Sequence, residues 1–335
     1  MKHSPFNRIT AYSGLFLMAF LVACTGDKPK EASHTENPPG PSFPAPAFNA
    51  DSAKAYVQQQ VDFGPRVPNT RAHVQCGDWL ITRLQGWADT VIVQPFRARA
   101  FDGTVLNGRN IVASFHPELG NRILLCAHWD TRPFADQDVE RTAEPIDGAN
   151  DGASGVGVLL EIARNLHLDT ANAAVDIILF DVEDYGQPDD SKLPPVQDSY
   201  CLGSQHWARN FHVPNYVARF GILLDMVGNT QARFTREGTS VQFAPYVVDQ
   251  VWKTAAGLGY GAYFVEENTK AIIDDHYYVN RLAGIKCIDI IHYQQDSPSN
   301  FWTHWHTHGD TMDKIDAQTL KAVGQTVLQV VYNEL

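Results

Sequence analysis

The sequence predicts an α/β protein, a three-layer sandwich in which helices cover both faces of a central, mixed and mostly parallel twisted sheet. Five apolar runs of β-forming residues alternate with segments of helical periodicity. The runs are apolar throughout, which is typical of strands that are buried on both faces. With 335 residues and 44% hydrophobic content, the chain has enough apolar surface to bury such a core.

The expected elements follow one another in a regular order. Asp51 and Ser52 can cap a helix that runs through Gln60, and residues 70–87 place Leu80, Leu84 and other apolar side chains at helical spacing. The expected strands cover residues 110–115, 122–127, 175–180, 220–225 and 286–292. The helices expected between and after them cover residues 152–167, 202–211, 241–257 and 317–332.

The N-terminal residues predict export. Two positive residues precede a short apolar run that ends in Leu21-Val22-Ala23-Cys24, a tetrad that resembles the lipobox of bacterial lipoproteins. We therefore expect residues 1–23 to be a lipoprotein signal peptide and Cys24 to anchor the protein to a membrane on the periplasmic side. The alternative is an ordinary cleaved signal with a stray cysteine. Residues 24–50 are rich in Pro, Ser, Lys and Glu and predict a flexible tether, which leaves residues 51–335 as one catalytic domain.

Charge and cysteine content narrow the possible functions. The formal charge is −12 and no run of Lys and Arg occurs, so we expect no nucleic-acid partner. The four cysteines besides Cys24 lack the close pair spacing of a thiolate zinc site, and their pairing stays open; they are Cys76, Cys126, Cys201 and Cys287. We expect a monomer.

Polar side chains follow the apolar runs at the points where the strands are expected to end. They are His128, Asp130, Asp181, Glu183, Asp184 and Asp225. Ligands of open α/β sheets bind outside the carboxyl ends of the strands. Asp151, in a loop that opens a helix, and a histidine at residues 304–308 add further candidate ligands. Because zinc binds imidazole nitrogen and carboxylate oxygen, these residues predict a zinc site, with Asp130 orienting the His128 ring.

Other catalytic templates fit less well. The sequence has no His-Glu-x-x-His helix signature. Residues 152–155, Gly-Ala-Ser-Gly, are one residue short of a Gly-x-Ser-x-Gly nucleophile elbow, and residues 152–157 lack the glycine order of a dinucleotide-binding loop. We interpret these glycines as allowing the backbone at Asp151 to lie close to a metal.

Five motifs resemble those of the zinc-dependent aminopeptidase superfamily, the peptidase M28-like proteins that include the glutaminyl cyclases. They are His128-x-Asp130, Gly148-Ala149-Asn150-Asp151-x-Ala153-Ser154-Gly155, Glu183-Asp184, Asp225 and His306-Thr307. The resemblance covers most of residues 55–333. The glutaminyl cyclase branch is the most similar, because Asp274-Asp275-His276 stands where peptidases usually have Ser-Asp-His, and Trp305 directly precedes the metal histidine.

The resemblance implies a function and a role for each site residue. The cyclases convert the N-terminal glutamine of peptides and proteins to pyroglutamate and release ammonia. By position, one zinc ion per chain would be held by Asp151, Asp184 and His306, with Glu183 as the general acid/base. Further members of the implied site are the carboxylate pair Asp225 and Asp274 and the pocket residues Trp305 and Phe301. His306 is preferred over His304 and His308 because its Trp-His-Thr context matches the family.

Departures from the family pattern and two alternatives stay open. Asp184 stands where mammalian cyclases have Glu, Asp189 where they have a second pocket tryptophan, and Asp289 where they have a pocket histidine. An aminopeptidase with two zinc ions is the first alternative, because His128 and Asp225 are both present as second-metal ligands. The other is a lipid-anchored binding protein that has kept an inactive enzyme fold, and the intact Glu183 argues against it.

Overall fold

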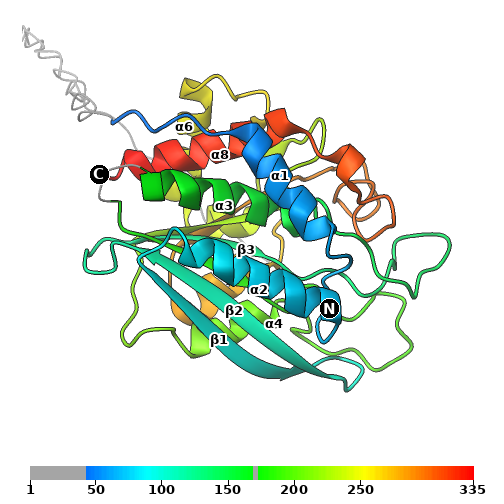
Figure 1. The fold of residues 1–335 in the computed structure, drawn as a ribbon. Helices are drawn as coiled ribbons and strands as arrows, with labels where there is room; N and C mark the ends of the chain where they lie inside the picture. The colour runs from blue at the N-terminus through cyan, green and yellow to red at the C-terminus, as the bar shows by residue number, and fades with distance from the viewer. Residues whose placement is uncertain (1–42, 169–172) are drawn as a thin grey trace, which may run out of the picture. The chain divides into compact units, whose positions relative to one another are not determined.

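The computed structural model describes residues 43–168 and 173–335. The predicted signal peptide, Cys24 and most of the predicted tether lie outside these residues. Within the described part, a six-stranded sheet has the strand order β1-β2-β4-β3-β5-β8; β1, β2 and β3 are labelled in Figure 1. The strands are β1 (Thr90–Arg99), β2 (Val105–Phe115), β3 (Ile123–His128), β4 (Val175–Phe180), β5 (Phe220–Asp225) and β8 (Cys287–Ile291).

The sheet is mixed and mostly parallel, as predicted. β4, β3, β5 and β8 are parallel neighbours, and β2 and β1 join one edge as antiparallel strands. The carboxyl ends of the four parallel strands therefore meet at one edge of the sheet. A separate pair, β6 (Phe234–Arg236) and β7 (Phe264–Asn268), lies outside the main sheet.

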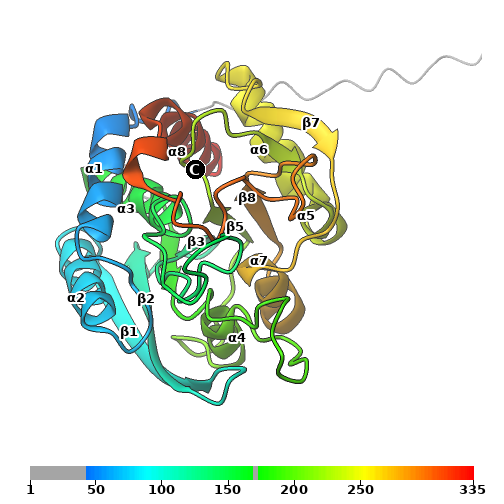
Figure 2. The same cartoon turned by 90° about the vertical axis from the view of Figure 1, so that its right-hand side faces the viewer.

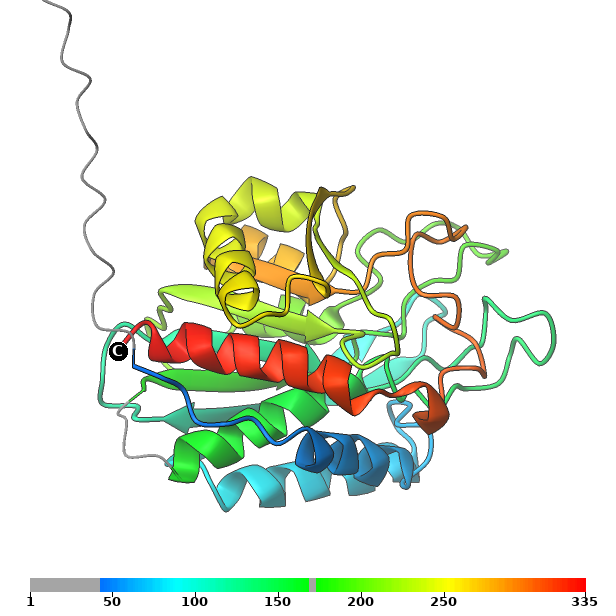
Figure 3. The same cartoon turned by 90° about the horizontal axis from the view of Figure 1, so that it is seen from above.

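Helices cover both faces of the sheet (Figures 2 and 3). Alternate strand residues point to opposite faces, so Leu125 and Leu124 of β3 belong to different apolar clusters. The Leu125 side packs against α1 (Ala50–Val61), α2 (Arg71–Gln85), α3 (Ala153–Leu168), α6 (Pro245–Gly257) and α8 (Ala317–Tyr332). The Leu124 side packs against α4 (Leu202–Arg209) and the π-helical turn Val279–Ala283, which follows α7 (Asp275–Tyr278).

Three of the differences from the sequence-based expectation have a clear physical reason. The first helix is capped by the side chain of Asn49, which accepts from the backbone N–H of Ser52. The helix expected at residues 241–257 is two helices, α5 (Gly238–Phe243) and α6, because Ala244 leaves the helical region and Pro245 opens the second helix. The edge strand β1 was not predicted, since Phe96 is its one buried side chain and it contains a proline.

The packed domain begins before residue 51, so the predicted tether is too long at its C-terminal end. The backbone N–H of Ala45 donates to Gln329 Oε1 at 3.1 Å, and that of Phe48 donates to Gln325 Oε1 at 2.9 Å. The ring of Phe48 is only 3% exposed. The ring can dock there because Gly324 of α8 has no Cβ, and the ring occupies the space into which a Cβ would project.

Two further features complete the fold. Cys76, Cys126, Cys201 and Cys287 are buried and carry free thiols. No helix in the described ranges is long and apolar enough to cross a bilayer.

Candidate active site

The carboxyl edge of the sheet gathers the predicted ligands. His128 is the last residue of β3, Asp225 is the last of β5, and Glu183 and Asp184 follow β4. Asp151 lies in the turn that opens α3, and His306 lies in the connection from β8 to α8. Gly155 lets α3 approach this edge, because a Cβ there would lie 2.2 Å from the backbone oxygen of Leu224.

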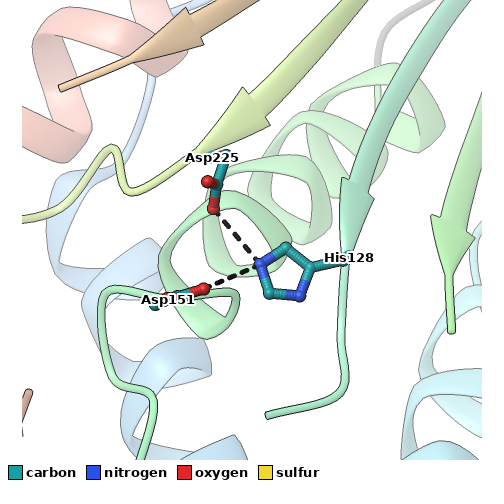
Figure 4. Close-up of side chains that lie close together, drawn as sticks. All are labelled: His128, Asp151 and Asp225. Atoms are coloured by element: carbon teal, nitrogen blue, oxygen red, sulfur yellow. Dashed lines mark hydrogen bonds and ion pairs between the residues drawn. The ribbon is translucent and has the colours of Figure 1, made fainter. Parts of the chain in front are cut away.

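These residues form two groups that share Asp151. His128 Nε2 lies 3.0 Å from one carboxylate oxygen of Asp151 and 3.2 Å from Asp225 Oδ1 (Figure 4). The other oxygen of Asp151 lies 3.8 Å from His306 Nε2, which is 3.1 Å from Asp184 Oδ1. In each group, three possible ligand atoms lie within 4.8 Å of one another.

The donor set fits zinc. Asp151 Oδ2 and Asp184 Oδ2 are buried atoms with no hydrogen-bond partner among the described residues, and buried polar atoms are seldom left so. Burial raises the pKa of Asp184 to about 6 and that of Asp225 to about 7, and the charge of Asp151 adds to both shifts. Crowded carboxylates of this kind are stabilised as anions by a divalent cation, and imidazole with carboxylates is a common zinc set.

The structure chooses among the three histidines of residues 304–308. Only His306 joins a metal group. His308 Nδ1 pairs with Asp138 Oδ2 at 2.8 Å, and the ring of His304 packs edge-on against Trp302. The preference for His306 over its neighbours therefore agrees with the geometry.

Asp130 acts differently from the prediction. Its carboxylate oxygen lies 3.6 Å from His128 Nδ1, which is too long for a hydrogen bond. Instead, the two oxygens of Asp130 accept from the backbone N–H groups of Glu183 and Asp184, at 3.0 and 3.1 Å. Asp130 therefore fixes the loop that carries Glu183 and Asp184, and it faces the His128 ring at ion-pair distance.

Supporting residues were missed by sequence reasoning. Asp136 Oδ1 lies 3.2 Å from His306 Nδ1 and also pairs with Arg132. Burial acts against ionisation of Asp136, but these two contacts hold its pKa well below the usual range. The carboxylate of Asp310 accepts from the backbone N–H groups of Asn150 and Asp151. For Asp310, the sequence offers one signal of a role at the site: it lies four residues after His306.

Glu183 lies beside the candidate zinc group and faces a cysteine. Its Oε1 accepts from the thiol of Cys201 at 3.1 Å, and the same sulfur lies 4.0 Å from Asp274 Oδ1. Burial raises the pKa of Glu183 well above its usual range, although the charge of His128 opposes the shift. A carboxyl with a raised pKa can both accept and return a proton near neutral pH. Cys201 could not be predicted, because a lone cysteine between a loop and a helix is not a motif.

The eight residues to which the resemblance assigns a role line one cavity of about 210 Å³. They are Asp151, Glu183, Asp184, Asp225, Asp274, Phe301, Trp305 and His306. The Trp305 ring stacks on His306 with centroids 3.7 Å apart and also contacts Phe301. Asp189 lines this cavity too, whereas Asp289 is buried in β8 near His276. This cavity is smaller than most drug-binding pockets, which favours a small ligand group.

The comparison with protein families shows the class of protein to which this fold and site belong. The chain belongs to peptidase family M28, whose model matches residues 110–331. The resemblance to that superfamily, predicted from five motifs, is confirmed.

Solved structures of proteins about 50% identical in sequence to this chain show which members of the family it resembles. A glutaminyl cyclase from Tannerella forsythia and one from Bacteroides thetaiotaomicron, bound to N-acetylhistamine, are each 52% identical, with TM-scores of 0.84 and 0.83. A Zn-dependent exopeptidase from Parabacteroides distasonis is also 52% identical, with a TM-score of 0.85. Each alignment covers 86% of this chain and 99% of the other. The predicted similarity to bacterial glutaminyl cyclases and the predicted fold are both confirmed.

Proposed function

We propose that this chain is a zinc-dependent glutaminyl-peptide cyclotransferase, which converts the N-terminal glutamine of peptides and proteins to pyroglutamate and releases ammonia. One observation carries the proposal: the carboxylate of Glu183 lines the same small cavity as the group Asp151, Asp184 and His306, with Trp305 as a wall. The 52% identity to proteins described as glutaminyl cyclases supports it. Asp151, Asp184 and His306 would hold the zinc ion.

The reaction requires that the substrate is held in a folded conformation and that one proton is transferred. A zinc ion bound by the three ligands would supply Lewis-acid polarisation of the substrate γ-carbonyl. Glu183 takes a proton from the α-amino group as the α-nitrogen bonds to the carbonyl carbon of the side-chain amide. Glu183 then gives that proton to the departing amide nitrogen as the C–N bond breaks, so ammonia leaves and no water is consumed. Trp305 and Phe301 hold the substrate folded, which favours ring closure.

The remaining carboxylates line the substrate cavity. Burial raises the pKa values of Asp225 and Asp274, and the charge of Asp274 adds to the shift at Asp225. Two close carboxyl groups of this kind tend to share one proton. In our proposal, the shared proton lets this pair donate a hydrogen bond to the substrate while retaining one negative charge for its α-amino group.

Ammonia release from a Gln-peptide tests the proposal directly. Wild-type protein should release one ammonia per peptide and no free amino acid, and mass spectrometry should show a loss of about 17 Da. The Glu183→Gln variant should lose turnover by roughly 100-fold or more while it still binds zinc. If the wild-type protein releases free N-terminal residues instead, the cyclase proposal is wrong.

An M28-type aminopeptidase with two zinc ions is the second candidate. It is favoured by one observation, the complete second group formed by His128, Asp151 and Asp225. In that case Glu183 would deprotonate a water molecule instead of the substrate amine. Hydrolysis of Leu-type substrates together with two metal ions per chain would favour this candidate over the cyclase.

We also propose that the protein is an exported lipoprotein anchored through Cys24, with residues 1–23 as its signal peptide. The positive residues Lys2 and Arg8, the apolar run after them and the tetrad ending in Cys24 support this proposal. A Cys24→Ala variant should move from the membrane fraction to the soluble fraction of the producing bacterium. Retention of the variant in the membrane fraction would exclude a lipid anchor at this residue.

A further inference from the structure

A second cavity adjoins the active-site cavity. Its volume is about 390 Å³, and it shares the lining residues Asp189, Tyr200 and Ile273 with the active-site cavity. The rest of its wall comes from the loop between β4 and α4, residues 187–199, and from Tyr278. Since three residues form a common boundary, a chain that leaves the active site past them enters the second cavity.

A peptide substrate has to extend out of the active-site cavity. The active-site cavity has room for the N-terminal residue, and the proposed reaction takes place only on that residue. The following residues of the peptide therefore extend along the adjoining surface. The second cavity lies at the correct place for their side chains.

The second cavity is acidic without a compensating cation. Asp189 and Asp198 line it, and neither Lys nor Arg lines it or the active-site cavity. Asp189 forms no ion pair with the described residues, and Asp198 accepts a hydrogen bond only from the neutral hydroxyl of Tyr278, at 2.8 Å. Lys192 belongs to the same loop but does not line the cavity. The negative charge of Asp189 and Asp198 is thus available to a ligand.

Exposed apolar side chains accompany the two carboxylates. Ile273 is 65% exposed, Leu193 46% and Val196 45%, and all three line the second cavity. Exposed apolar side chains grouped around a cavity mark a binding surface. A lysine or arginine side chain matches both features, because its aliphatic stem packs on apolar surface while its charged end stays beside a carboxylate.

We propose that the second cavity is a subsite for the residues that follow the N-terminal glutamine, and that it selects peptides with Lys or Arg at the second or third position. This inference rests on the proposed cyclase function and names its preferred substrate class. Asp189 and Asp198 determine the specificity and take no part in the chemical step.

Matched peptides test the subsite. Amidated peptides Gln-Lys-Ala-Ala and Gln-Ala-Lys-Ala are compared with the same peptides carrying Glu in place of Lys, and kcat/KM is measured by ammonia release. At one or both positions, the Lys peptide should be favoured by about three- to five-fold at low ionic strength, and the preference should shrink in ~0.5 M salt. Asp189→Asn and Asp198→Asn should each reduce the preference. Asp190→Asn is the matched control, since Asp190 is exposed and lines neither cavity.

The outcomes separate the two proposals. If no Gln-peptide releases ammonia, the proposed function fails. If all peptides are cyclised but Lys and Glu peptides react equally, only the subsite is wrong. The subsite is also wrong if the preference for Lys survives in both Asp189→Asn and Asp198→Asn, because the active-site carboxylates would then be its source.

Discussion

The thiol of Cys201 is the one side-chain hydrogen-bond donor to the carboxylate of Glu183 among the described residues. Burial raises the pKa of this thiol well above its usual value, so the sulfur keeps its proton and stays a donor. Removing the donor would free the Glu183 side chain to leave the position from which, in our proposal, it exchanges a proton with substrate. We therefore assign Cys201 a positioning role.

Two substitutions at Cys201 test that role. Cys201→Ala should lower kcat by about five-fold, which corresponds to one net hydrogen bond of about 1 kcal/mol, with KM nearly unchanged. Cys201→Ser retains a donor of similar size and should keep most of kcat. Steady-state kinetics on a Gln-peptide measures both. Equal losses in the two variants would show that the thiol matters only for packing.

His292 makes stability depend on pH. Its ring is 6% exposed and its Nδ1 lies 2.9 Å from Asn229 Oδ1. Burial, together with the charge of Arg233, lowers its pKa to about 4. Because the unfolded chain has a histidine pKa of about 6.5, the unfolded state takes up the proton first as the pH falls. The stability gained from a neutral His292 is complete above about pH 6.5 and is lost between about pH 6.5 and pH 4.

A His292→Gln variant should lack this loss. Between pH 7 and pH 4, wild-type protein should lose about 2–3 kcal/mol more of its free energy of unfolding than the variant. Urea unfolding at a series of pH values measures the free energy of unfolding of both proteins. Zinc release and all other titrations affect the two proteins equally, so they cancel in the comparison. Parallel stability curves for wild type and variant would contradict the assignment.

At the scale of elements, the strands were predicted well where they are buried on both faces. β4 and β5 agree with the expected bounds to the residue, because continuous apolar runs between polar residues mark such strands clearly. β1 was missed, since an exposed edge strand has no such run. His128, Asp184 and Asp225 followed from strand ends, and Asp151, His306 and the pocket residues followed from the family motifs. Asp136, Cys201 and Asp310 reach the site from loops whose course the sequence does not determine.

Residues 43–49 were predicted to be part of the tether, but they pack against α8. Proline-rich composition favours an extended chain, but it does not prevent docking of a single buried ring. Phe48 is 3% exposed, whereas Phe43 is 52% exposed. Phe48→Ala should lower the free energy of unfolding by about 3–5 kcal/mol, and Phe43→Ala should change it by less than about 0.5 kcal/mol. Thermal and urea unfolding of the two variants compare them, and equal stabilities would place the domain boundary at residue 51.

At the scale of the whole molecule, the parallel sheet explains why distant parts of the sequence meet. Its strands deliver His128, Asp184 and Asp225 to one edge, and the loops before α3 and α8 add Asp151 and His306. The acidic excess of the chain is partly concentrated there. Without a cation, this edge holds several buried carboxyl groups whose charges repel one another, so we expect metal binding and folding to be coupled.

Zinc removal tests this coupling and the number of metal ions. We expect one zinc ion per chain, held by Asp151, Asp184 and His306, and a lower melting temperature after chelation that added zinc restores. At a free zinc concentration about 1,000 times the Kd, the gain in unfolding free energy is about 4 kcal/mol. Elemental analysis after gel filtration measures the stoichiometry, and calorimetry measures the melting temperature.

Two variants distinguish the groups that share Asp151. His306→Ala should lose the bound zinc and its stabilisation, because it removes the only nitrogen ligand of the proposed group. Asp225→Asn should keep one zinc ion, because Asp225 belongs only to the group with His128 and Asn preserves the side-chain shape. Two zinc ions in wild-type protein and one in Asp225→Asn would instead show that both groups bind metal. The water-activating aminopeptidase would then become the better description, because two adjacent metal ions can hold both the attacking oxygen and the scissile carbonyl.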